Sequence, residues 1–449
     1  MSKRIDVHYV TRVEGHGNIV VEVADRKVQD CRFEVVEAPR FFEAMLRGRP
    51  YTEAAHITSR ICGICSTGHA ATSLRATEKA LGVEPSEQTK LLRKLTFHGE
   101  ILDSHVLHVY MLVAPDFLGV GSVIPLAASH PEIVKRALRM KKLAGDMCQV
   151  VAGRHTHPIA MTVGGFTHFP KREELEGLRR RLVAARADVE ATVELFASLK
   201  WPQFERETEY VSLTRLDEYA FMDGEIVTSD GVRLPVEDYR QVTNEYLVRH
   251  SSAKHTRHAR ASYMVGALAR FNNNYEKLYP RAKEAATALG LKPAVTNPFL
   301  NSAAQVVEIV HCVEDSMVVI DRLLAEGITP EEPAPVKLGA AEGVGACEVP
   351  RGLLIHHYWI GEDGRLTGAD CVIPTNQNIG NLEADMRARV PQMVDRPVEA
   401  IQLDLEMLVR AYDPCISCSV HVLKVEGERT KDDGGDYPDS RRWQSITRR

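Results

Sequence analysis

Two pairs of cysteines have the spacing of metal ligands. Cys62 and Cys65 form one Cys-x-x-Cys pair near the start of the chain, and Cys415 and Cys418 form another near its end. Two thiolates three residues apart can chelate one ion, and four are enough for a tetrahedral zinc or an iron–sulfur cluster. Gly63 is expected to let the backbone fold tightly between the first two thiolates. One pair alone would also suit a redox dithiol or two unrelated buried thiols.

The wide separation of the two pairs bears on the kind of site. A structural zinc ribbon usually keeps its pairs close together in sequence, whereas residues 66–414 lie between these two. Such a site forms only when the whole chain has folded. The separation therefore favours a central catalytic site over a local staple, while a zinc-stabilised scaffold stays open until the metal content is analysed.

The elements that must position these cysteines are mostly helical. Apolar residues recur at helical spacing in four long stretches, and β-formers gather between turn residues in three others. Helices are predicted over 85–106, 130–153, 171–199 and 303–324, and strands within 5–36, 219–235 and 353–372. We therefore predict an α+β fold with a predominantly helical body, a central bundle of long helices, and β-rich N-terminal and C-terminal edges.

Composition excludes several classes of protein. The 449 residues are 44% hydrophobic, which allows a sizeable core. A net charge of −5, with Lys and Arg spread along the chain, argues against a nucleic-acid binder. No apolar stretch is long enough to span a membrane, and the N-terminus lacks a signal-peptide pattern. A soluble, intracellular protein is predicted, and nine cysteines favour metal or redox use over disulfides.

The residues around both cysteine pairs resemble the signature of the large subunit of nickel–iron hydrogenases. Residues 60–69 read Arg-x-Cys-Gly-x-Cys-x-x-x-His, and residues 413–421 read Asp-Pro-Cys-x-x-Cys-x-x-His. Three further stretches are similar to motifs of that family: Thr-Arg-Val-Glu-Gly-His-Gly at 11–17, Pro-Arg-Gly at 350–352 and Pro-Thr-x-x-Asn at 374–378. The resemblance implies that family's fold, with residues 1–421 as a single large-subunit domain.

The resemblance implies a nickel–iron centre on the four cysteines. All four would bind nickel, Cys65 and Cys418 would also bridge to iron, and Cys62 and Cys415 would be terminal. The iron would carry two cyanides and one carbon monoxide. The other five cysteines have no paired spacing and are expected to be buried apolar residues, which leaves no iron–sulfur cluster in this chain: Cys31, Cys148, Cys312, Cys347 and Cys371.

The implied activity is reversible heterolytic cleavage of dihydrogen to protons and electrons. By resemblance, Cys415 is the first proton acceptor and Glu14 takes the proton onward. Arg351 would place its guanidinium over the open metal position, with Asp413 orienting it. The alternatives are that Glu14 forms an ion pair with Arg12 or acts as a capping carboxylate, and that Arg351 and Asp413 form a plain buried pair.

Two smaller features follow from the same resemblance. The backbone around Pro350 and the hydroxyl of Thr375 are expected to donate hydrogen bonds to the cyanides. Many members carry an aspartate at the position that here falls on Ser104, with Asp103 one residue away. A polar contact to Arg351 is therefore expected to be lost or replaced.

A second metal position is also implied. The stretch 40–43 resembles the segment that supplies a carboxylate, here Glu43, to a magnesium or iron ion. The other protein ligands would be His421 and a backbone carbonyl near Cys371, with water completing the octahedral shell.

The resemblance extends to partners and processing. Electrons must leave through an iron–sulfur small subunit, then through further flavin or iron–sulfur subunits, as in the cytoplasmic branch of the family that uses soluble acceptors. A maturation protease would cut between His421 and Val422, releasing the extension 422–449, and nickel-insertion factors would load the metal. An unprocessed or retained tail stays open.

Two other functions share this fold. A dihydrogen sensor would keep the metal site with little turnover, although such relatives commonly lack the C-terminal extension. Relatives in respiratory complex I have lost the metal-binding cysteines, whereas this chain keeps all four.

Overall fold

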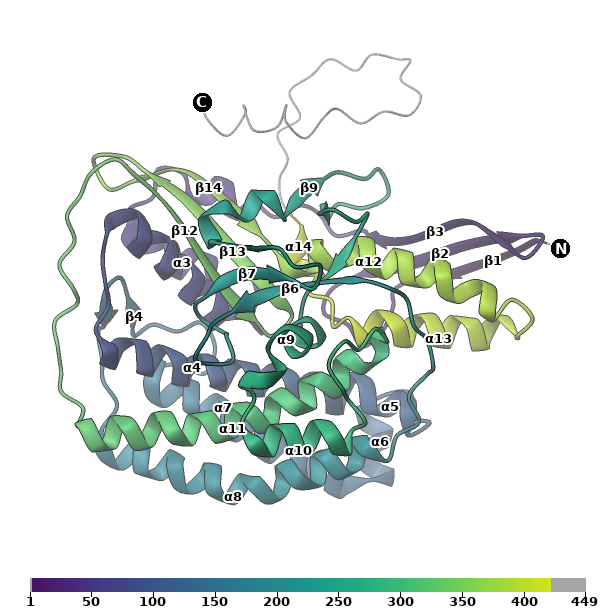
Figure 1. Ribbon diagram of the computed structural model, residues 1–449, viewed down its shortest axis with the longest axis horizontal. Helices are drawn as coiled ribbons and strands as arrows, with labels where there is room; N and C mark the ends of the chain where they lie inside the picture. The colour runs from purple at the N-terminus through teal and green to yellow at the C-terminus, as the bar shows by residue number, and fades with distance from the viewer. Residues whose placement is uncertain (1, 421–449) are drawn as a thin grey trace, which may run out of the picture.

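Four long helices form the body of the protein in this computed structural model, which describes residues 2–420 (Figure 1). They pack side by side, with α4 against α7 and α11, and α8 against α11 and α7. The four are α4 (Glu87–Leu107), α7 (Pro131–Ala152), α8 (Arg172–Ala197) and α11 (Asn301–Glu326). Each overlaps one of the predicted helical stretches, with α4 ending one residue later and α11 extending two residues further at both ends, so the predicted helical body is confirmed.

The helix ends follow from local sequence. The Ser86 hydroxyl accepts a hydrogen bond from the backbone N–H of Thr89 at 3.0 Å and so caps α4. Pro131 occupies the first turn of α7, where a missing N–H costs nothing. Gly327 follows α11 with a φ of 82°, a conformation that favours glycine.

The N-terminal sheet is an antiparallel meander of β1 (Ser2–Val7), β2 (Gly17–Ala24) and β3 (Lys27–Val35). It projects from one side of the body, beside α12 (Pro374–Arg389) and α13 (Val398–Ala411) (Figure 1). The link between β1 and β2 contains residues 11–16 of the Thr-Arg-Val-Glu-Gly-His-Gly motif, and the last glycine of the motif, Gly17, begins β2.

The C-terminal sheet lies on α3 (Ser66–Leu81). It comprises β12 (Ala341–Val349), β13 (Gly352–Ile360) and β14 (Leu366–Val372), all antiparallel. A Cβ on Gly345 would lie 2.4 Å from the backbone N of Ala76, so glycine is required for this close approach. The predicted strands within 353–372 are confirmed, whereas β12 was missed because its glycines obscure the strand pattern.

A third sheet covers the middle of the body. Its order is β11 (Tyr263–Met264), β6 (Glu209–Thr214), β7 (Glu225–Thr228) and β8 (Arg233–Leu234), and the last two strands lie in the predicted stretch 219–235. Short elements complete the fold: α1 (Phe42–Leu46), α2 (Ala54–Thr58), a π-helix (His108–Val113), α5 (Ala114–Phe117), α6 (Val123–Ser129), β4 (Met161–Thr162), β5 (Gly165–Phe166), β9 (Asn244–Tyr246), β10 (His255–Arg257), α9 (Ala267–Asn274), α10 (Pro280–Ala288) and α14 (Ile416–Ser419).

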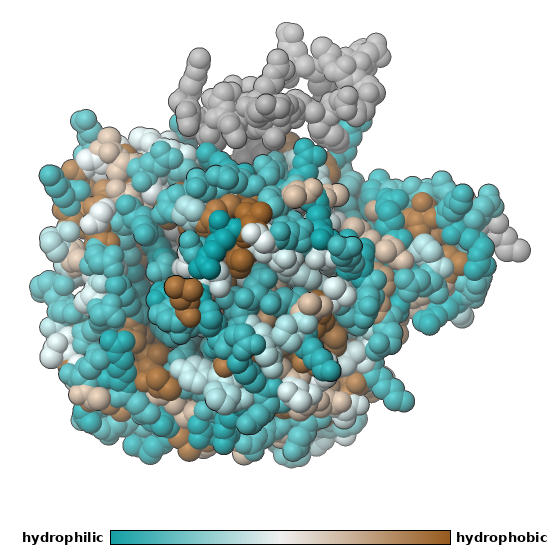
Figure 2. Space-filling view, viewed as in Figure 1, coloured by the Kyte–Doolittle hydropathy of each residue, from teal (hydrophilic) through white to brown (hydrophobic). Residues whose placement is uncertain are grey.

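The fold class is α+β, as predicted, because the sheets are separate and lie outside a helical body. The face in Figure 2 is mostly hydrophilic with small scattered apolar patches. Within residues 2–420, no helix combines the length and the apolar composition needed to cross a bilayer. His421 and the extension 422–449 lie outside the described residues, so the predicted cleavage stays a prediction.

Candidate metal centre

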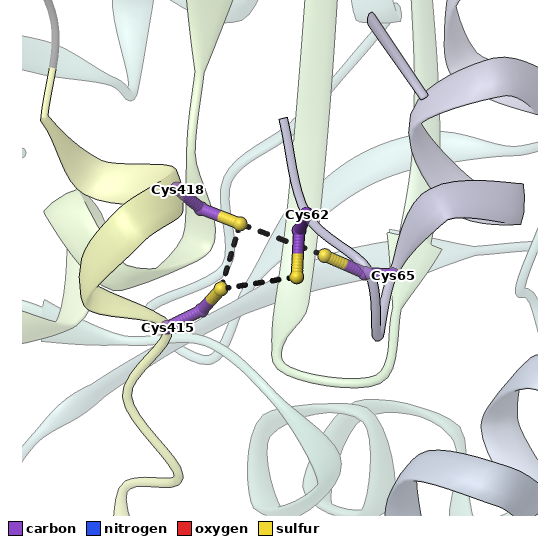
Figure 3. Close-up of side chains that lie close together, drawn as sticks. All are labelled: Cys62, Cys65, Cys415 and Cys418. Carbon is purple, nitrogen blue, oxygen red and sulfur yellow. Dashed lines mark hydrogen bonds between the residues drawn. The ribbon is translucent and has the colours of Figure 1, made fainter. Parts of the chain in front are cut away.

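The four motif cysteines converge on one buried point (Figure 3). The sulfur of Cys415 lies 3.5 Å from that of Cys62 and 2.7 Å from that of Cys418, and the sulfurs of Cys65 and Cys418 are 3.6 Å apart. Two thiolates that each lie about 2.3 Å from one tetrahedral ion are about 3.8 Å apart, so most of these separations suit shared metal ligands.

One arginine holds the two cysteine segments together. The guanidinium of Arg40 donates to the carbonyl of Ile61 at 2.7 Å and to that of Ser417 at 3.3 Å. Cys65 directly precedes α3, so its position is fixed by the start of that helix. The expectation for Gly63 was wrong, because its φ is not positive and a Cβ there would have no atom within 4 Å.

The stretch that contains Glu14 lies directly beside the second cysteine pair. Glu14 and Cys415 form an isolated parallel β-bridge, and the N–H of Ile416 donates to the carbonyl of Glu14 at 3.0 Å. Gly15 is required here, since its φ is +86° and a Cβ would lie 2.6 Å from the Cβ of Ile416.

The carboxylate of Glu14 is bound by Ser417 and not by Arg12. Ser417 donates its N–H at 3.0 Å and its hydroxyl at 2.5 Å to the two carboxylate oxygens. Arg12 instead pairs with Asp116 and donates to the carbonyl of Leu112 at 2.6 Å. The Arg12 alternative is therefore wrong, whereas the contact with the N–H of Ser417, in the first turn of α14, is that of a capping carboxylate.

Arg351 and Asp413 form a buried ion pair beside the sulfurs. The guanidinium Nη2 lies 3.0 Å from the carboxylate, and Nε donates to the backbone carbonyl of Asp413 at 2.8 Å. Burial alone would lower the pKa of Arg351, but Asp413 and the thiolates of Cys415 and Cys62 raise it well above its ordinary value. Nη1 of Arg351 is buried and has no hydrogen-bond partner among the described residues.

Asp413 is itself held by two residues of the helical body. Gln305 donates its side-chain N–H to the carboxylate at 3.0 Å, and His108 lies 3.8 Å from it. Burial would raise the pKa of Asp413, but Arg351 and His108 hold it below its usual range. The carboxylate is therefore fixed in its charged form, facing the guanidinium.

The chemistry of the sulfurs fits a soft metal. Burial raises the pKa of the Cys415 and Cys418 thiols well above their ordinary value. Four thiolates without a cation would therefore be unstable here, whereas coordination to a metal deprotonates thiols and stabilises the thiolates. Together with the partnerless Nη1 of Arg351, this donor set fits a bound metal group that also accepts hydrogen bonds.

Pro350 and Thr375 lie at the same site. The hydroxyl of Thr375 accepts the N–H of Cys415 at 2.9 Å, which leaves its own proton to be donated elsewhere. The carbonyl of Pro350 accepts a hydrogen bond from Arg270 at 3.0 Å. Arg270 is fully buried and pairs with Glu308, so it fixes the turn that carries Arg351.

Sequence reasoning missed several residues that hold the site. Glu100 accepts the N–H groups of Thr67 and Gly68 at 2.5 and 2.9 Å, next to the first cysteine pair. His69 lies 3.8 Å from the sulfur of Cys418 and 3.2 Å from a ring nitrogen of His356. His69 belongs to the first cysteine motif, whereas Glu100 and His356 lie outside the motifs and only tertiary packing brings them to the site.

The two described members of the second metal position are neighbours. The N–H of Cys371 donates to the carboxylate of Glu43 at 2.9 Å. Burial raises the pKa of Glu43 to about 7, against the opposing charge of Lys254. Asp370 and Glu245 also lie near this carboxylate and were missed in the sequence. His421 lies outside the described residues.

The departure at Ser104 and Asp103 is visible in the structure. Asp103 turns away to pair with Lys141 at 2.7 Å, and the Ser104 hydroxyl is buried without a hydrogen-bond partner among residues 2–420. Neither side chain hydrogen bonds to Arg351, whose carboxylate partner is Asp413.

The chain matches a known protein family over most of its length. Residues 40–133 and 225–421 match the family model described as nickel-dependent hydrogenase, and residues 4–38 match a model described as HoxL-like. The alpha chain of sulfhydrogenase 1 from Pyrococcus furiosus is 36% identical over 424 residues, covering 94% of this chain and 98% of the relative. One component of the F420-non-reducing hydrogenase from Methanothermobacter thermautotrophicus is 30% identical, covering 94% and 95%.

Solved structures agree with these matches. A crystal structure of an NAD+-reducing [NiFe]-hydrogenase in the H2-reduced state superposes with a TM-score of 0.83 at 27% identity, covering 93% of this chain and 99% of that one. The Ni-Fe-Se hydrogenase of D. vulgaris Hildenborough gives a TM-score of 0.74 at 26% identity, covering 94% and 100%. The four buried thiolates thus stand in the fold that these enzymes share, and the chain belongs to the nickel-dependent hydrogenase family as the catalytic subunit of an enzyme that acts on dihydrogen.

Proposed function

We propose that the four cysteines hold a nickel–iron centre that catalyses the reversible heterolytic cleavage of dihydrogen. Nickel would be bound by all four sulfurs, and Cys65 and Cys418 would bridge to an iron that carries two cyanides and one carbon monoxide. Cys62 and Cys415 would be terminal. The convergence of four buried thiolates beside the partnerless Nη1 of Arg351 supports this assignment. When bound, the metal pair supplies the electrophile for dihydrogen and accepts its electrons.

Proton transfer is assigned to Cys415 and Glu14. The Cys415 sulfur would take the first proton, since a coordinated thiolate is a base held at the reacting position. Glu14 would carry the proton onward, because its backbone pairs directly with Cys415 and its carboxylate contacts Ser417. Each turnover releases two protons and two electrons, so a route for both is required.

The remaining site residues would hydrogen bond to the cyanide ligands of the iron or orient the guanidinium of Arg351. Arg351 would place Nη1 at the open side of the centre, oriented by its ion pair with Asp413. The backbone around Pro350, through the N–H of a residue other than the proline itself, and the hydroxyl of Thr375 would donate to the cyanides. Hydrogen bonds from a fixed, buried donor set cost no reorganisation during the reaction.

A second cation is proposed at Glu43, with the carbonyl of Cys371 and the side chain of His421 as its other protein ligands. The contact between Glu43 and Cys371 supports this position. A hard ion such as Mg2+, or Fe2+, with water in its other positions, suits a carboxylate and a carbonyl oxygen.

Both sequence relatives named above are designated as single subunits of hydrogenases, and one structural relative is NAD+-reducing. By extension, we infer an iron–sulfur small subunit, further flavin or iron–sulfur subunits and a soluble electron acceptor in the cytoplasm. Nickel-insertion factors and a protease that removes 422–449 would mature the chain. Measured turnover decides between this enzyme and a dihydrogen sensor, which would show little.

The test is elemental analysis and infrared spectroscopy of the complex purified from a host able to mature it. We expect one nickel per large subunit, with cyanide and carbonyl stretching bands. A complex that contains zinc alone, or that lacks these bands, would contradict the proposal.

A further inference from the structure

A second cluster of metal-ligating side chains lies outside the cysteine site. His250, His255 and Glu383 place their ligand atoms within 4.8 Å of one another. His250 immediately precedes the segment that leads to β10, His255 is the first residue of β10, and Glu383 lies on α12. Segments far apart in the sequence therefore supply the three groups.

The geometry directs both imidazoles at one carboxylate. Nε2 of His250 lies 2.8 Å from one oxygen of Glu383, and Nε2 of His255 lies 3.5 Å from the other. The first oxygen also accepts the N–H of Phe33 at 2.9 Å. The second oxygen and the ring of His255 thus face each other without a well-formed hydrogen bond.

His255 is the anomaly in this cluster. Its side chain is 2% exposed, and neither ring nitrogen has a hydrogen-bond partner among the described residues. A buried polar group without a partner costs about 1–3 kcal/mol, so such groups are rare in folded proteins. Hydrogen bonding within the cluster satisfies His250, whereas His255 makes only a 3.5 Å contact with the second oxygen of Glu383.

We propose that His250, His255 and Glu383 bind a divalent cation of the zinc class. One ion between the three groups would engage both Nε2 atoms and the free oxygen of Glu383. Two imidazoles and one carboxylate are a known zinc donor set, whereas magnesium and calcium prefer oxygen ligands alone. The side chains of His250 and Glu383 are 19% and 17% exposed, so a water molecule can reach the fourth position.

This site is distinct from the second metal position described above. Lys254, the residue before His255, directs its amine to Glu245 at 2.6 Å, and its charge acts on Glu43. His255 contacts Glu383 instead. The two neighbouring residues thus serve two different polar clusters.

The position of the cation suggests what it does. The segment between the two histidines is attached on both sides: Ser252 donates its N–H to the carbonyl of Val35 at 3.0 Å, and Ala253 forms a β-bridge with Val420. Val420 follows Cys418 by two residues. A cation that ties this segment to α12 would therefore brace the end of the chain that supplies the second cysteine pair.

The test uses the assembled complex with its nickel–iron centre loaded, so that the thiolates are already occupied. The complex is stripped with a mild chelator, titrated with Zn2+ against a chromophoric competitor, and analysed for metal. We expect one Zn2+ per large subunit beyond the other metals. A wild-type complex that takes up no additional Zn2+ overturns the proposal, independently of how any variant folds.

Variants locate the ion. His255→Gln and Glu383→Gln should each weaken Zn2+ binding by at least about 10–100-fold, the loss that follows even from removing an outer-shell partner. Glutamine at 383 keeps an acceptor for the Phe33 N–H. His130→Gln, at an exposed histidine elsewhere, should bind Zn2+ as the wild type does. Equal binding by all of these variants overturns the site.

Spectroscopy identifies the ligands. X-ray absorption at the zinc edge should show only nitrogen and oxygen neighbours, with the scattering pattern of imidazole. Co2+ in place of Zn2+ should give visible bands of a four-coordinate site, absent in His255→Gln. Sulfur neighbours would place the ion at cysteines and would contradict the proposal.

Discussion

Ser417 donates both its backbone N–H and its hydroxyl to the carboxylate of Glu14. Residues from the two ends of the chain are thereby joined beside the second cysteine pair. The two hydrogen bonds hold the carboxylate in place at the start of α14. The contact fixes Glu14 beside the segment that carries Cys415 and Cys418, while Arg12 pairs with Asp116 instead.

Glu14→Gln should slow proton exchange while leaving the metal in place. Glutamine keeps one oxygen that can accept the Ser417 N–H, and its amide N–H can donate to the Ser417 hydroxyl, but it has no basic carboxylate. Loss of a general acid–base group typically lowers the rate about 10²–10⁴-fold. Isotope exchange between dihydrogen and deuterated water measures the step. Glu37→Gln, a carboxylate that accepts the N–H of His16 instead, is the control. Unchanged exchange in Glu14→Gln would remove this residue from the relay.

Cys415→Ser should abolish turnover. A serine hydroxyl is a poor ligand for a soft metal and a poor proton acceptor at neutral pH. Dihydrogen-dependent dye reduction and nickel content report the two effects. Cys31→Ala is the matched control, because Cys31 is buried outside the site and burial raises its pKa to about 12. Activity retained by Cys415→Ser would contradict its assignment.

Arg351→Lys should lower turnover by about 10²–10³-fold, the range for losing one donor at a reacting centre. Lysine keeps a charge for Asp413 but cannot pair with it and also present a second N–H to the metal side. Turnover rates of the variant and the wild type, compared at equal nickel content, test this prediction. The control is Arg389→Lys, a buried pair with Asp404. Equal small losses in both variants would mean that Arg351 is only a structural ion pair.

Acid stability should depend on Glu308. Burial alone would raise its pKa, but Arg270 and His105 hold it at about 2, below the ordinary 4.5. A depressed pKa contributes stability that is complete above about pH 4.5 and is lost as pH falls toward about 2. Glu308→Gln should therefore cost about 3–5 kcal/mol at neutral pH and flatten the acid dependence.

Urea unfolding of the complex at several pH values measures this effect. Glu132→Gln removes an exposed carboxylate and should leave both the midpoint and its pH dependence close to those of the wild type. If the free energy of unfolding of Glu308→Gln falls with pH as steeply as that of the wild type, the charge of Glu308 does not support the fold.

The helical body and the cysteine site were predictable because their signals are local. Helical spacing and end signals such as Ser86 and Pro131 read directly from sequence, as do two thiolates three residues apart. The two cysteine motifs could be assigned to one site without a structure, because both resemble parts of the same family signature.

The supporting residues could not be predicted because their relationships are purely tertiary. Glu100 meets the first cysteine loop from α4, and Arg270 fixes the Arg351 turn from α9. The prediction for Gly63 was wrong for a different reason. The rule that glycine permits a tight turn was applied to a residue whose backbone conformation does not need glycine. Glycine is required instead at Gly15 and Gly345.

The origin of the thiolates from both ends of the chain also bears on protein synthesis. During translation, Cys62 and Cys65 leave the ribosome long before Cys415 and Cys418 are made. A product truncated before Cys415 carries half of these thiolates and cannot form the four-cysteine site. The long gap between the motifs thus delays assembly of the four-cysteine site until nearly the whole chain has been made.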